Sequence, residues 1–577
     1  MNQKTFTSLK FVHNFISKYW LLLFFIVSTI YLELVFRLWI FKSLSTDFIF
    51  VLLFSLSASI ILFILSYVFP PLINKLLSIT LLSLLIVIYS IQLVYYDVFK
   101  TTLSFFSLTG TRDVLQFKSI IITAVFRNII ALLLLFIPLF ILPFIYRKCR
   151  FERLKLKPLL ILLAFLLISH AASLFCVSFT KETEYSQYDL YYKSAIPELS
   201  VNKLGLMTTM RLDVKRLLFG INYNDNVEEC SNNDVIETVS KFVYRAEVTS
   251  THNIEPNCTF TTPTPEPTFS TNVSNIDFEA LISNEKDKTL LDMHKYFYSV
   301  EPSKKNKYTG MFKDHNLILI TAEGFSPYAI SPELTPTLYK MSTEGFFFNN
   351  FYNPIWGVST SDGEYVACTG LIPKSGIWSF SRSGKNYMPF VMGNQLKNFG
   401  YTLKAYHNHS YKYYNRHISH PNMGYDYKGI GNGLNIKNTW PESDLEMIDV
   451  TMDEYIGNVP FHTYYMTISG HLNYTFGGNY IARKNKAYVE HLPFSDKAKA
   501  YIACNMELEF AVKSLMDKLE EAGIADKTVI AISPDHYPYG LPKENIDELA
   551  GHKVEDNFEL YKSTLILWKK GMDTVIV

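Results

Sequence analysis

Five long apolar runs in the first 180 residues constrain this chain more than any other feature of its sequence. Each is long enough to cross a bilayer, which takes about 20 residues of helix. The first run is too long for a signal peptide and has no clear small-residue cleavage site. We therefore expect residues 1–180 to form a transmembrane bundle of five helices, near 19–40, 48–69, 74–96, 120–146 and 157–178.

Basic residues predict the orientation of this bundle, because cytoplasmic loops are enriched in lysine and arginine. Lys4, Lys10 and Lys18 precede the first run, and an even number of crossings separates them from a second basic group. We expect a multi-pass plasma membrane protein with a cytoplasmic N-terminus, so that everything after about residue 180 is extracellular. The second group lies between the fourth and fifth runs and comprises Arg147, Lys148, Arg150, Arg153, Lys155 and Lys157.

Two charged residues, Glu33 and Arg37, lie on one helix face within the first run. Charges at membrane depth are costly and usually point into the helix bundle. Two interpretations are open, and the first is favoured: an internal ion pair that fixes helix packing, or a contact for a lipid headgroup.

Composition excludes some functions and leaves others open. The net charge of +1 gives no reason to expect a nucleic-acid partner. No CxxC or Cys/His zinc spacing occurs among the six cysteines. Cys230 and Cys258 lie in a polar stretch outside the membrane, where a disulfide and two free thiols are equally compatible with the sequence.

After the bundle, the chain divides into two regions. Residues 181–310 contain juxtamembrane helical patterns, a Thr/Pro-rich linker over 226–275 and one predicted helix over 277–300. Residues 311–577 alternate short β-rich runs with helical ones, including a long helix over 495–522, which predicts an α/β domain with a mostly parallel sheet. The expected strands are Leu317–Thr321, Thr402–Tyr406, His462–Ser469, Thr528–Ile532 and Ser563–Trp568.

Acidic and histidine residues follow four of these strands, and ligands of open α/β sheets bind at the carboxyl ends of strands. Glu323, Asp535 and His536 form a set of oxygen and imidazole donors suited to Zn²⁺ or Mn²⁺. His407 and His471 follow two further strands.

The stretch GVSTSDGEY, from Gly357 to Tyr365, supplies three adjacent hydroxyls at a predicted helix N-terminus. Such a position favours an anion, and a hydroxyl beside a divalent metal is more easily deprotonated. A simple Ser/Thr N-cap is the competing interpretation. The co-occurrence with the metal-ligand set favours a nucleophile.

Together these motifs resemble the extracellular sulfatase-like domain of lipoteichoic acid synthases, in the alkaline phosphatase superfamily. The resemblance rests on ITAEGFSP, GVSTSDGEY, HNHSYKYYNR, TISGH and SPDH in this order, and on the five preceding apolar runs. Where the family continues for tens of residues, this chain stops at Val577, so the sequence is either a fragment or a domain that is closed differently.

The resemblance implies a role for each matching residue. Thr360 would be the nucleophile, and Glu323, Thr360, Asp535 and His536 would bind one divalent metal, first of all Mn²⁺, with Zn²⁺ or Mg²⁺ as alternatives. The phosphate and headgroup would contact His407, His409, Tyr414, Arg416 and His471, and His471 would also act in catalysis.

Two positions depart from the family pattern. Tyr414 stands where the synthases have a tryptophan, which keeps an aromatic face. His409 stands where they have an aspartate, which removes an anionic acceptor for glycerol hydroxyls. His417 and His420 are expected to be solvated loop residues.

The predicted activity is transfer of a phosphoglycerol-type headgroup from a phospholipid, first of all phosphatidylglycerol, to a glycolipid, polymer or glycan acceptor of the cell envelope. A phospho-threonine-type intermediate on Thr360 would link the two steps. The alternatives are a phosphoethanolamine transferase, a headgroup-releasing phosphodiesterase and, ranked lower, a non-catalytic envelope sensor or scaffold. Only Cys368 and Cys504 fall in the outer domain, which argues against the phosphoethanolamine transferases and their multiple cysteines.

Overall fold

The computed structural model describes residues 3–99, 102–103, 118–149, 151–181, 185–193, 196–219, 269–273, 276–354, 356–374 and 377–577. The chain forms two compact units, one of Met1–Leu218 with Phe312–Val577, and one of Phe219–Met311. Most of the predicted linker over 226–275 lies outside the described residues, as do Cys230 and Cys258. Both interpretations of these cysteines, a disulfide and two free thiols, therefore stay predictions.

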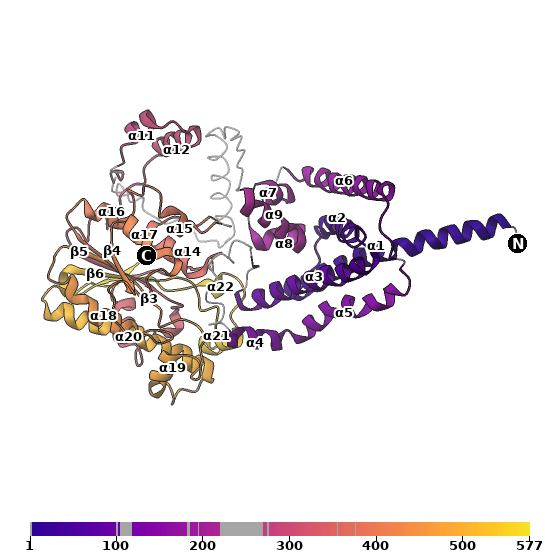
Figure 1. The fold of residues 1–577 in the computed structure, drawn as a ribbon. Coiled ribbons are helices and arrows are strands. Elements are labelled where there is room, and N and C mark those ends of the chain that lie inside the picture. Colours follow the sequence, from indigo (N-terminus) through magenta and orange to yellow (C-terminus); the bar gives the residue numbers. More distant parts are fainter. Residues whose placement is uncertain are drawn as a thin grey trace, which may run out of the picture. The chain divides into compact units, whose positions relative to one another are not determined.

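Among the described residues, five helices of the N-terminal part are long and apolar enough to cross a membrane (Figure 1). Their apolar segments are Tyr19–Ile40, Phe48–Leu65, Pro71–Val98, Ile129–Tyr146 and Leu156–Ser178, which confirms the prediction of five spans. The helices themselves are α1 (Gln3–Ile40), α2 (Phe48–Leu65), α3 (Pro71–Phe99), α5 (Ile129–Tyr146) and α6 (Leu156–Ser178).

The fourth span is shorter than the sequence predicted. A break at Asn128 separates α4 (Lys118–Arg127) from α5, so the predicted helix over 120–146 is in fact two helices. The Asn128 side chain accepts a hydrogen bond from Trp39 Nε1 (2.8 Å) and donates to Asp97 Oδ2 (2.9 Å). The break therefore coincides with a polar contact between helices, which apolar run length alone does not reveal.

Glu33 and Arg37 are both buried, and both contact the short helices that follow the bundle. Glu33 Oε1 accepts a hydrogen bond from the Met207 backbone N–H (3.3 Å), and Arg37 Nη2 donates to Asn202 Oδ1 (3.1 Å). A buried polar group needs such partners. The two charges therefore tie α1 to the short helices, which are α7 (Gln187–Tyr192), α8 (Pro197–Leu204) and α9 (Leu206–Phe219).

The second unit contains two helices where the sequence predicted one over 277–300. Helix α11 (Phe278–Asn284) and helix α12 (Lys288–Ser299) each begin after an aspartate. The carboxylate of Asp277 accepts from the Ala280 N–H (2.9 Å), and that of Asp287 from the Leu290 N–H (3.0 Å). Asp287 caps a new helix N-terminus inside the predicted one.

The C-terminal part is built on an eight-stranded sheet with strand order β4-β3-β5-β1-β6-β7-β2-β8. The five strands from β4 to β6 are parallel, whereas β7 is antiparallel to both of its neighbours. The predicted mostly parallel α/β fold is therefore confirmed. The strands are β1 (Asn316–Ala322), β2 (Phe346–Phe347), β3 (Thr402–Ser410), β4 (Asp426–Ile430), β5 (Phe461–Met466), β6 (Thr528–Pro534), β7 (Ile566–Lys569) and β8 (Val575–Ile576).

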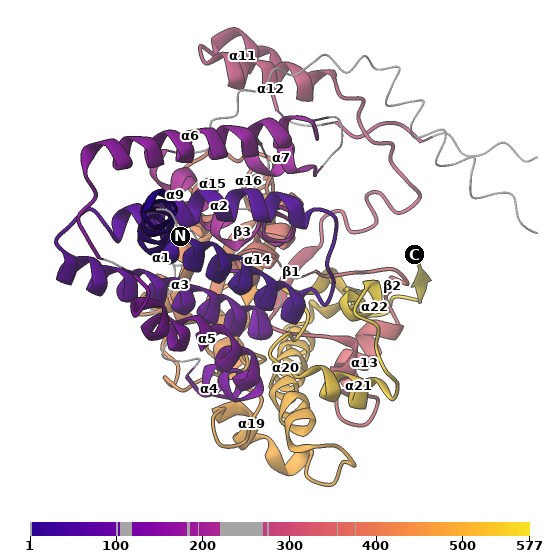
Figure 2. The same cartoon turned by 90° about the vertical axis from the view of Figure 1, so that its right-hand side faces the viewer.

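Helices cover both faces of this sheet (Figures 1 and 2). Successive side chains of a strand point to opposite faces, and β1 shows this clearly. Ile318 and Ile320 join the core formed with α18 and α20, whereas Leu319 joins the core formed with α14 and α15. The helices of this part are α13 (Pro336–Thr343), α14 (Ser359–Thr369), α15 (Ser379–Ser383), α16 (Met392–Lys397), α17 (Arg416–Asn422), α18 (Asp444–Thr451), α19 (Tyr480–Lys484), α20 (Asp496–Glu521), α21 (Lys543–Ala550) and α22 (Phe558–Tyr561).

All five predicted strands are present, with shifted ends. Strand β3 continues to Ser410 and so includes His407 and His409. Its partner β4 pairs with it up to His407 and, after a register shift, again at Ser410. Strand β7 begins at Ile566, later than predicted. The short strands β2, β4 and β8 were not predicted.

Candidate active site

The carboxyl ends of two neighbouring parallel strands form the base of the site. Ala322 of β1 is paired with Pro534 of β6, so Glu323 and the Asp535-His536 pair leave the sheet side by side. Thr360, the second residue of α14, is brought to the same place. This is the edge at which ligands of open α/β sheets bind.

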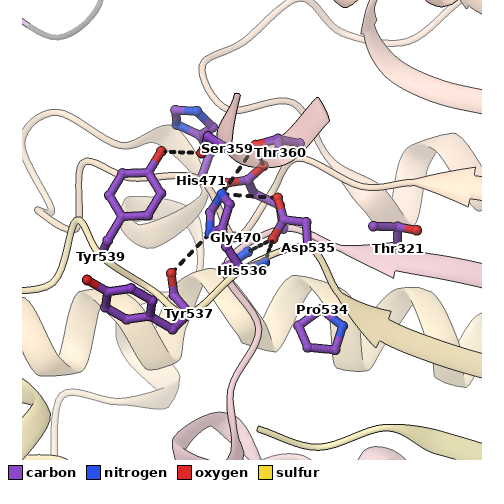
Figure 3. A network of polar contacts seen from close by, with 12 residues as sticks. Thr321, Ser359, Thr360, Gly470, His471, Pro534, Asp535, His536, Tyr537 and Tyr539 are labelled. Atoms are coloured by element: carbon purple, nitrogen blue, oxygen red, sulfur yellow. Dashed lines mark hydrogen bonds and ion pairs between the residues drawn. The ribbon is translucent and has the colours of Figure 1, made fainter. Parts of the chain in front are cut away.

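The four residues predicted to bind a metal meet at this edge. Figure 3 labels three of them, Thr360, Asp535 and His536. Thr360 Oγ1 lies 3.1 Å from Glu323 Oε2 and 3.2 Å from His536 Nε2. One ligand atom from each of Glu323, Asp535 and His536 lies within 4.8 Å of the others, and all three residues are buried. Residues more than 200 positions apart in sequence thus converge on one point.

Hydrogen bonds from neighbouring groups orient the donor atoms of this cluster. Asp535 Oδ1 accepts from the backbone N–H groups of Gly324 (2.9 Å) and His536 (2.8 Å), while its buried Oδ2 has no hydrogen-bond partner. His536 Nδ1 lies 3.0 Å from the Tyr537 carbonyl oxygen. Because a carbonyl only accepts, Nδ1 carries the proton and Nε2 is left as a ligand atom.

Two glycines allow the segments of the site to approach closely. A Cβ atom at Gly363 would lie 2.0 Å from the Asp535 carbonyl oxygen, and one at Gly470 would lie 2.0 Å from the Glu323 carbonyl oxygen. Both distances are far below van der Waals contact. Glycine at these positions is therefore a condition for assembling the cluster.

The structure distinguishes the three adjacent hydroxyls of GVSTSDGEY. Ser359 Oγ contacts the Tyr539 hydroxyl (2.9 Å), and Ser361 Oγ accepts from Trp378 Nε1 (2.9 Å). Thr360 Oγ1 is the hydroxyl that joins the acidic and histidine cluster. Ser359 has a φ of 43°, a strained value for a non-glycine residue and one that often occurs at functional sites.

The cluster fits a divalent cation. Burial, and then the nearby Asp535 carboxylate, raise the pKa of Glu323 well above its ordinary value. Two buried carboxylates repel each other unless a positive charge lies between them. Two carboxylates, one imidazole and one hydroxyl form a donor set that suits Mn²⁺ or Zn²⁺, and the orphan Asp535 Oδ2 is a natural ligand atom.

Arg416 is prepared to bind an anion. Its side chain is buried, and its Nε donates to Glu364 Oε2 (2.9 Å). Both Nη1 and Nη2 are buried without a hydrogen-bond partner. Burial alone would lower the pKa of Arg416, but Glu364 more than offsets this and raises it. A permanently charged fork with two unused donors matches a phosphate group.

His407 and His471 have similar geometry. His407 Nδ1 lies 3.0 Å from the Met466 carbonyl oxygen, and His471 Nδ1 lies 2.5 Å from the Leu472 carbonyl oxygen. Burial lowers the pKa of His407 well below its ordinary value and that of His471 to about 4. Both rings are therefore neutral near pH 7, and each has an unprotonated Nε2 that accepts hydrogen bonds.

The remaining predicted substrate residues, His409 and Tyr414, lie among aromatic rings. The guanidinium carbon of Arg416 lies 5.3 Å from the Tyr414 ring centre, and the Tyr414 ring lies 5.6 Å from Trp378. The His409 ring lies 6.1 Å from His407. Tyr414 has a φ of 54°, a strained value for a non-glycine residue, so the surrounding contacts must hold its backbone in this conformation.

His420 contradicts its prediction as a solvated residue, and His417 is only partly exposed. His420 is buried, with Nε2 at 3.1 Å from Glu364 Oε1. The sequence indicated a loop, but Arg416 begins a helix, and α17 turns His420 toward the interior.

Several residues of the site were not predicted. Glu364 was inside the quoted GVSTSDGEY stretch, and its position one helical turn after Thr360 was an available signal. Asp444 accepts from the Ile468 N–H (3.0 Å) and the Ser469 N–H (3.1 Å), which fixes the loop that carries His471, and no pattern in the sequence indicated this. The others are Trp378, Trp440, Glu442 and Tyr539.

A parallel sheet whose carboxyl edge holds an acid, a hydroxyl at a helix N-terminus and an Asp-His pair is typical of the alkaline phosphatase superfamily. Residues 315–573 match the family model of the sulfatases. This domain is therefore similar to the sulfatases, and the chain is similar to lipoteichoic acid synthases over the same part.

Two curated relatives support this placement. The lipoteichoic acid synthase-like protein YvgJ of Bacillus subtilis is 22% identical over 263 residues, which cover 44% of this chain and 41% of the relative. The lipoteichoic acid synthase of Staphylococcus saprophyticus is 27% identical over 276 residues, again with 44% and 41% covered. The match thus spans about two fifths of the length of these relatives.

Two solved structures are similar over part of the chain. One is the lipoteichoic acid synthase LtaP from Listeria monocytogenes, with 19% identity, a TM-score of 0.41 and coverage of 49% of this chain and 73% of the other. The other is the phosphoglycerol transferase GacH of Streptococcus pyogenes, with 15% identity, a TM-score of 0.32 and coverage of 54% and 81%.

Proposed function

We propose that this chain is a membrane-anchored, metal-dependent transferase that moves a phosphoglycerol-type headgroup from a phospholipid, phosphatidylglycerol in the first place, to a cell-envelope acceptor. The observation that carries the proposal is the position of the buried Thr360 Oγ1, 3.1 Å from Glu323 Oε2 and 3.2 Å from His536 Nε2. Asp535 Oδ2 lies 3.2 Å from the same His536 Nε2 and accepts no hydrogen bond. The names of the relatives and the apolar helices support the same class of reaction.

Glu323, Thr360, Asp535 and His536 would hold one divalent metal, with Mn²⁺ as the first expectation. When bound, such a cation supplies positive charge next to the Thr360 hydroxyl and the phosphorus oxygens. The two unused Nη donors of Arg416 bind the remaining phosphate oxygens. The N-terminus of α14 adds backbone N–H groups and a favourable dipole.

The reaction has two steps. In the first, Thr360 Oγ1 forms a bond to phosphorus, the bond between phosphorus and the diacylglycerol oxygen breaks, and the threonine proton is balanced by protonation of that leaving oxygen. In the second, an acceptor hydroxyl attacks phosphorus and Thr360 leaves. The unprotonated Nε2 of His471 can accept the proton of the acceptor hydroxyl, and a proton returns to Thr360 Oγ1 as it leaves.

The membrane helices give this chemistry access to its donor. A phospholipid does not leave the bilayer without losing the burial of its acyl chains. The lysines before the first apolar segment, Tyr19–Ile40, and the basic group around the connection from α5 to α6 support a cytoplasmic N-terminus and an extracellular catalytic domain. Cys368 and Cys504 are both free and buried, which supports a phosphoglycerol over a phosphoethanolamine transferase.

The proposal is tested with the full-length protein in phosphatidylglycerol vesicles loaded with Mn²⁺. Mass spectrometry of the peptide that contains residues 357–365 should detect a glycerophosphoryl adduct on Thr360. Thr360→Ala should abolish both the adduct and headgroup release. Ser361→Ala is the matched control and should keep the adduct. It removes the hydroxyl next to Thr360 in sequence, which accepts a hydrogen bond from Trp378 Nε1.

Two results would contradict the assignment. Full headgroup release by Thr360→Ala would exclude Thr360 as the nucleophile. Release of free glycerol phosphate at an unchanged rate, with and without a glycan or glycolipid acceptor, would identify a phosphodiesterase instead of a transferase.

A further inference from the structure

A pocket of about 330 Å³ lies between the membrane helices and the α/β domain, within the first compact unit. The described residues that line it include none of the four metal ligands, so it is a second site. Pockets of this size hold small ligands or parts of larger ones. Its walls are Asp97 and Val98 of α3, Thr123, Ala124 and Arg127 of α4, and from the α/β domain residues 473–475, Gly478, Lys497 and residues 539–544.

Tyr539 connects this pocket to the metal-ligand cluster. Its hydroxyl lies 2.9 Å from Ser359 Oγ, and its ring centre lies 4.6 Å from that of His536 (Figure 3). Ser359 directly precedes Thr360, the proposed nucleophile. One side chain therefore borders both the pocket and the residues around the reacting hydroxyl.

The pocket lies at the boundary of the apolar segments. The candidate span of α3 ends at Val98, which lines the pocket, and the next candidate span begins at Ile129, two residues after Arg127. The polar headgroup regions of a bilayer flank its hydrocarbon core. A ligand in this pocket is therefore at the depth of lipid headgroups and glycerol backbones.

Helix α4 has an apolar edge beside the edge that lines the pocket. Residues four apart lie on one face of a helix, so Thr123 and Arg127 form one edge, and Ile122 and Phe126 form the next. The side chains of Ile122 and Phe126 are 45% and 72% exposed, and Ile130 of α5 is also exposed. Acyl chains can follow this apolar edge from the pocket into the bilayer, which favours a lipid over a water-soluble ligand.

The free charges of the pocket are balanced. Arg127 and Lys497 line it together with Asp97 and Glu544, while Lys543 is bonded to a carboxylate of its own helix (2.5 Å). Arg127 Nη1 lies 3.4 Å from Asp97 Oδ2, and its side chain is 45% exposed, so this ion pair is weak. Arg127 can therefore donate to a ligand. Donors without excess positive charge suit the ester oxygens of a lipid better than a free phosphate ion.

We infer that this pocket binds the diacylglycerol end of the donor phospholipid, with the ester oxygens beside Arg127 and Lys497 and the acyl chains along α4 and α5. The phosphodiester then extends past Tyr539 to Thr360. The inference rests on the proposed function for the identity of the donor, but the binding of the lipid can be measured without turnover.

Photolabelling tests lipid binding by itself. The full-length Thr360→Ala chain, which cannot form the adduct, is reconstituted with Mn²⁺ in vesicles of phosphatidylglycerol that carries a diazirine at the start of one acyl chain. The label should appear on the peptides that contain residues 118–127 or 539–544. Thr123→Trp places a large ring in the pocket from an exposed position, and it should reduce this labelling about tenfold.

Turnover by the chain with Thr360 intact gives a second readout. Thr123→Trp should lower kcat/KM for headgroup release from phosphatidylglycerol about tenfold, and should leave cleavage of the nitrophenyl ester of glycerol phosphate, which has no acyl chains, within about twofold. Ser178→Trp is the matched control and should change neither rate. It puts the same ring in place of an exposed hydroxyl at the end of another membrane helix, α6.

The outcomes are distinct. Labelling confined to other peptides, or an equal loss with both substrates in Thr123→Trp, would overturn the inference. So would a Thr123→Trp chain that forms the adduct from phosphatidylglycerol at the normal rate but no longer transfers it to a glycolipid, since the pocket would then serve the acceptor. Pocket labelling that Thr123→Trp removes, in a protein whose Thr360 never acquires an adduct, would support the inference and overturn the proposed function instead.

Discussion

Removal of the Glu364 carboxylate charge is the sharpest test of the proposed role of Arg416 in phosphate binding. Glu364 is fully buried, with Oε2 at 2.9 Å from Arg416 Nε and Oε1 at 3.1 Å from His420 Nε2. The Tyr464 hydroxyl also donates to Oε1 (3.1 Å). Burial alone would raise the pKa of Glu364, but Arg416 and His420 hold it below its ordinary value.

The Glu364→Gln substitution keeps an acceptor for Arg416 but leaves a buried cation uncompensated. Breaking a buried ion pair costs about 3 kcal/mol or more of unfolding free energy. For a domain of this size that corresponds to a fall in Tm of roughly 6 to 12 °C. The Glu364 carboxylate also holds Arg416 through Nε, which leaves both Nη groups available to phosphate. Because the substitution weakens this hold, we also expect about a hundredfold loss in kcat.

Thermal unfolding in detergent and headgroup release, both on the full-length chain, measure these two effects. Glu344→Gln is the control, because Glu344 forms only an exposed pair with Lys340 (3.8 Å) and such pairs contribute about 0.5 kcal/mol or less. A Glu364→Gln protein with wild-type Tm and wild-type kcat would refute the role of Glu364 in positioning Arg416.

Two further predictions concern the metal and acid stability. Chelation should lower the Tm of the wild-type chain, and Mn²⁺ at a hundredfold its Kd should restore about 2.7 kcal/mol of unfolding free energy. Asp535→Asn should lose this response to Mn²⁺, whereas substitution of an exposed carboxylate, Asp517→Asn, should keep it. Equal responses of the two variants would exclude the cluster as the metal site. Burial lowers the pKa of His462 to about 4 and outweighs the hydrogen bond to the Leu317 carbonyl oxygen (3.1 Å), which acts in the opposite direction. The other ring nitrogen lies 2.8 Å from the Tyr425 hydroxyl. Because the pKa is lower in the folded state than the ordinary value near 6.5, its contribution is complete above pH 6.5 and is lost as the pH falls toward 4, by about 3 kcal/mol in total. His462→Gln should therefore flatten the dependence of unfolding free energy on pH in this interval, and an unchanged slope would show that His462 does not titrate there.

The sequence alone determined the features that depend on neighbouring residues. Length and apolarity define the five spans, and alternation of strand and helix patterns defines the α/β domain. The convergence of Glu323 and Asp535 was also predictable, because both directly follow buried parallel strands, and parallel strands bring their carboxyl ends to one edge.

Only the tertiary structure decided the partners of buried charges. Arg416 meets Glu364 across 52 positions, and His409 meets Glu442 across 33, in segments that no local pattern links. The break at Asn128 likewise depends on Trp39 and Asp97 of other helices. The physical reason is that a buried polar group takes whichever partner the packed fold brings near it, and the order of residues along the chain does not contain that proximity.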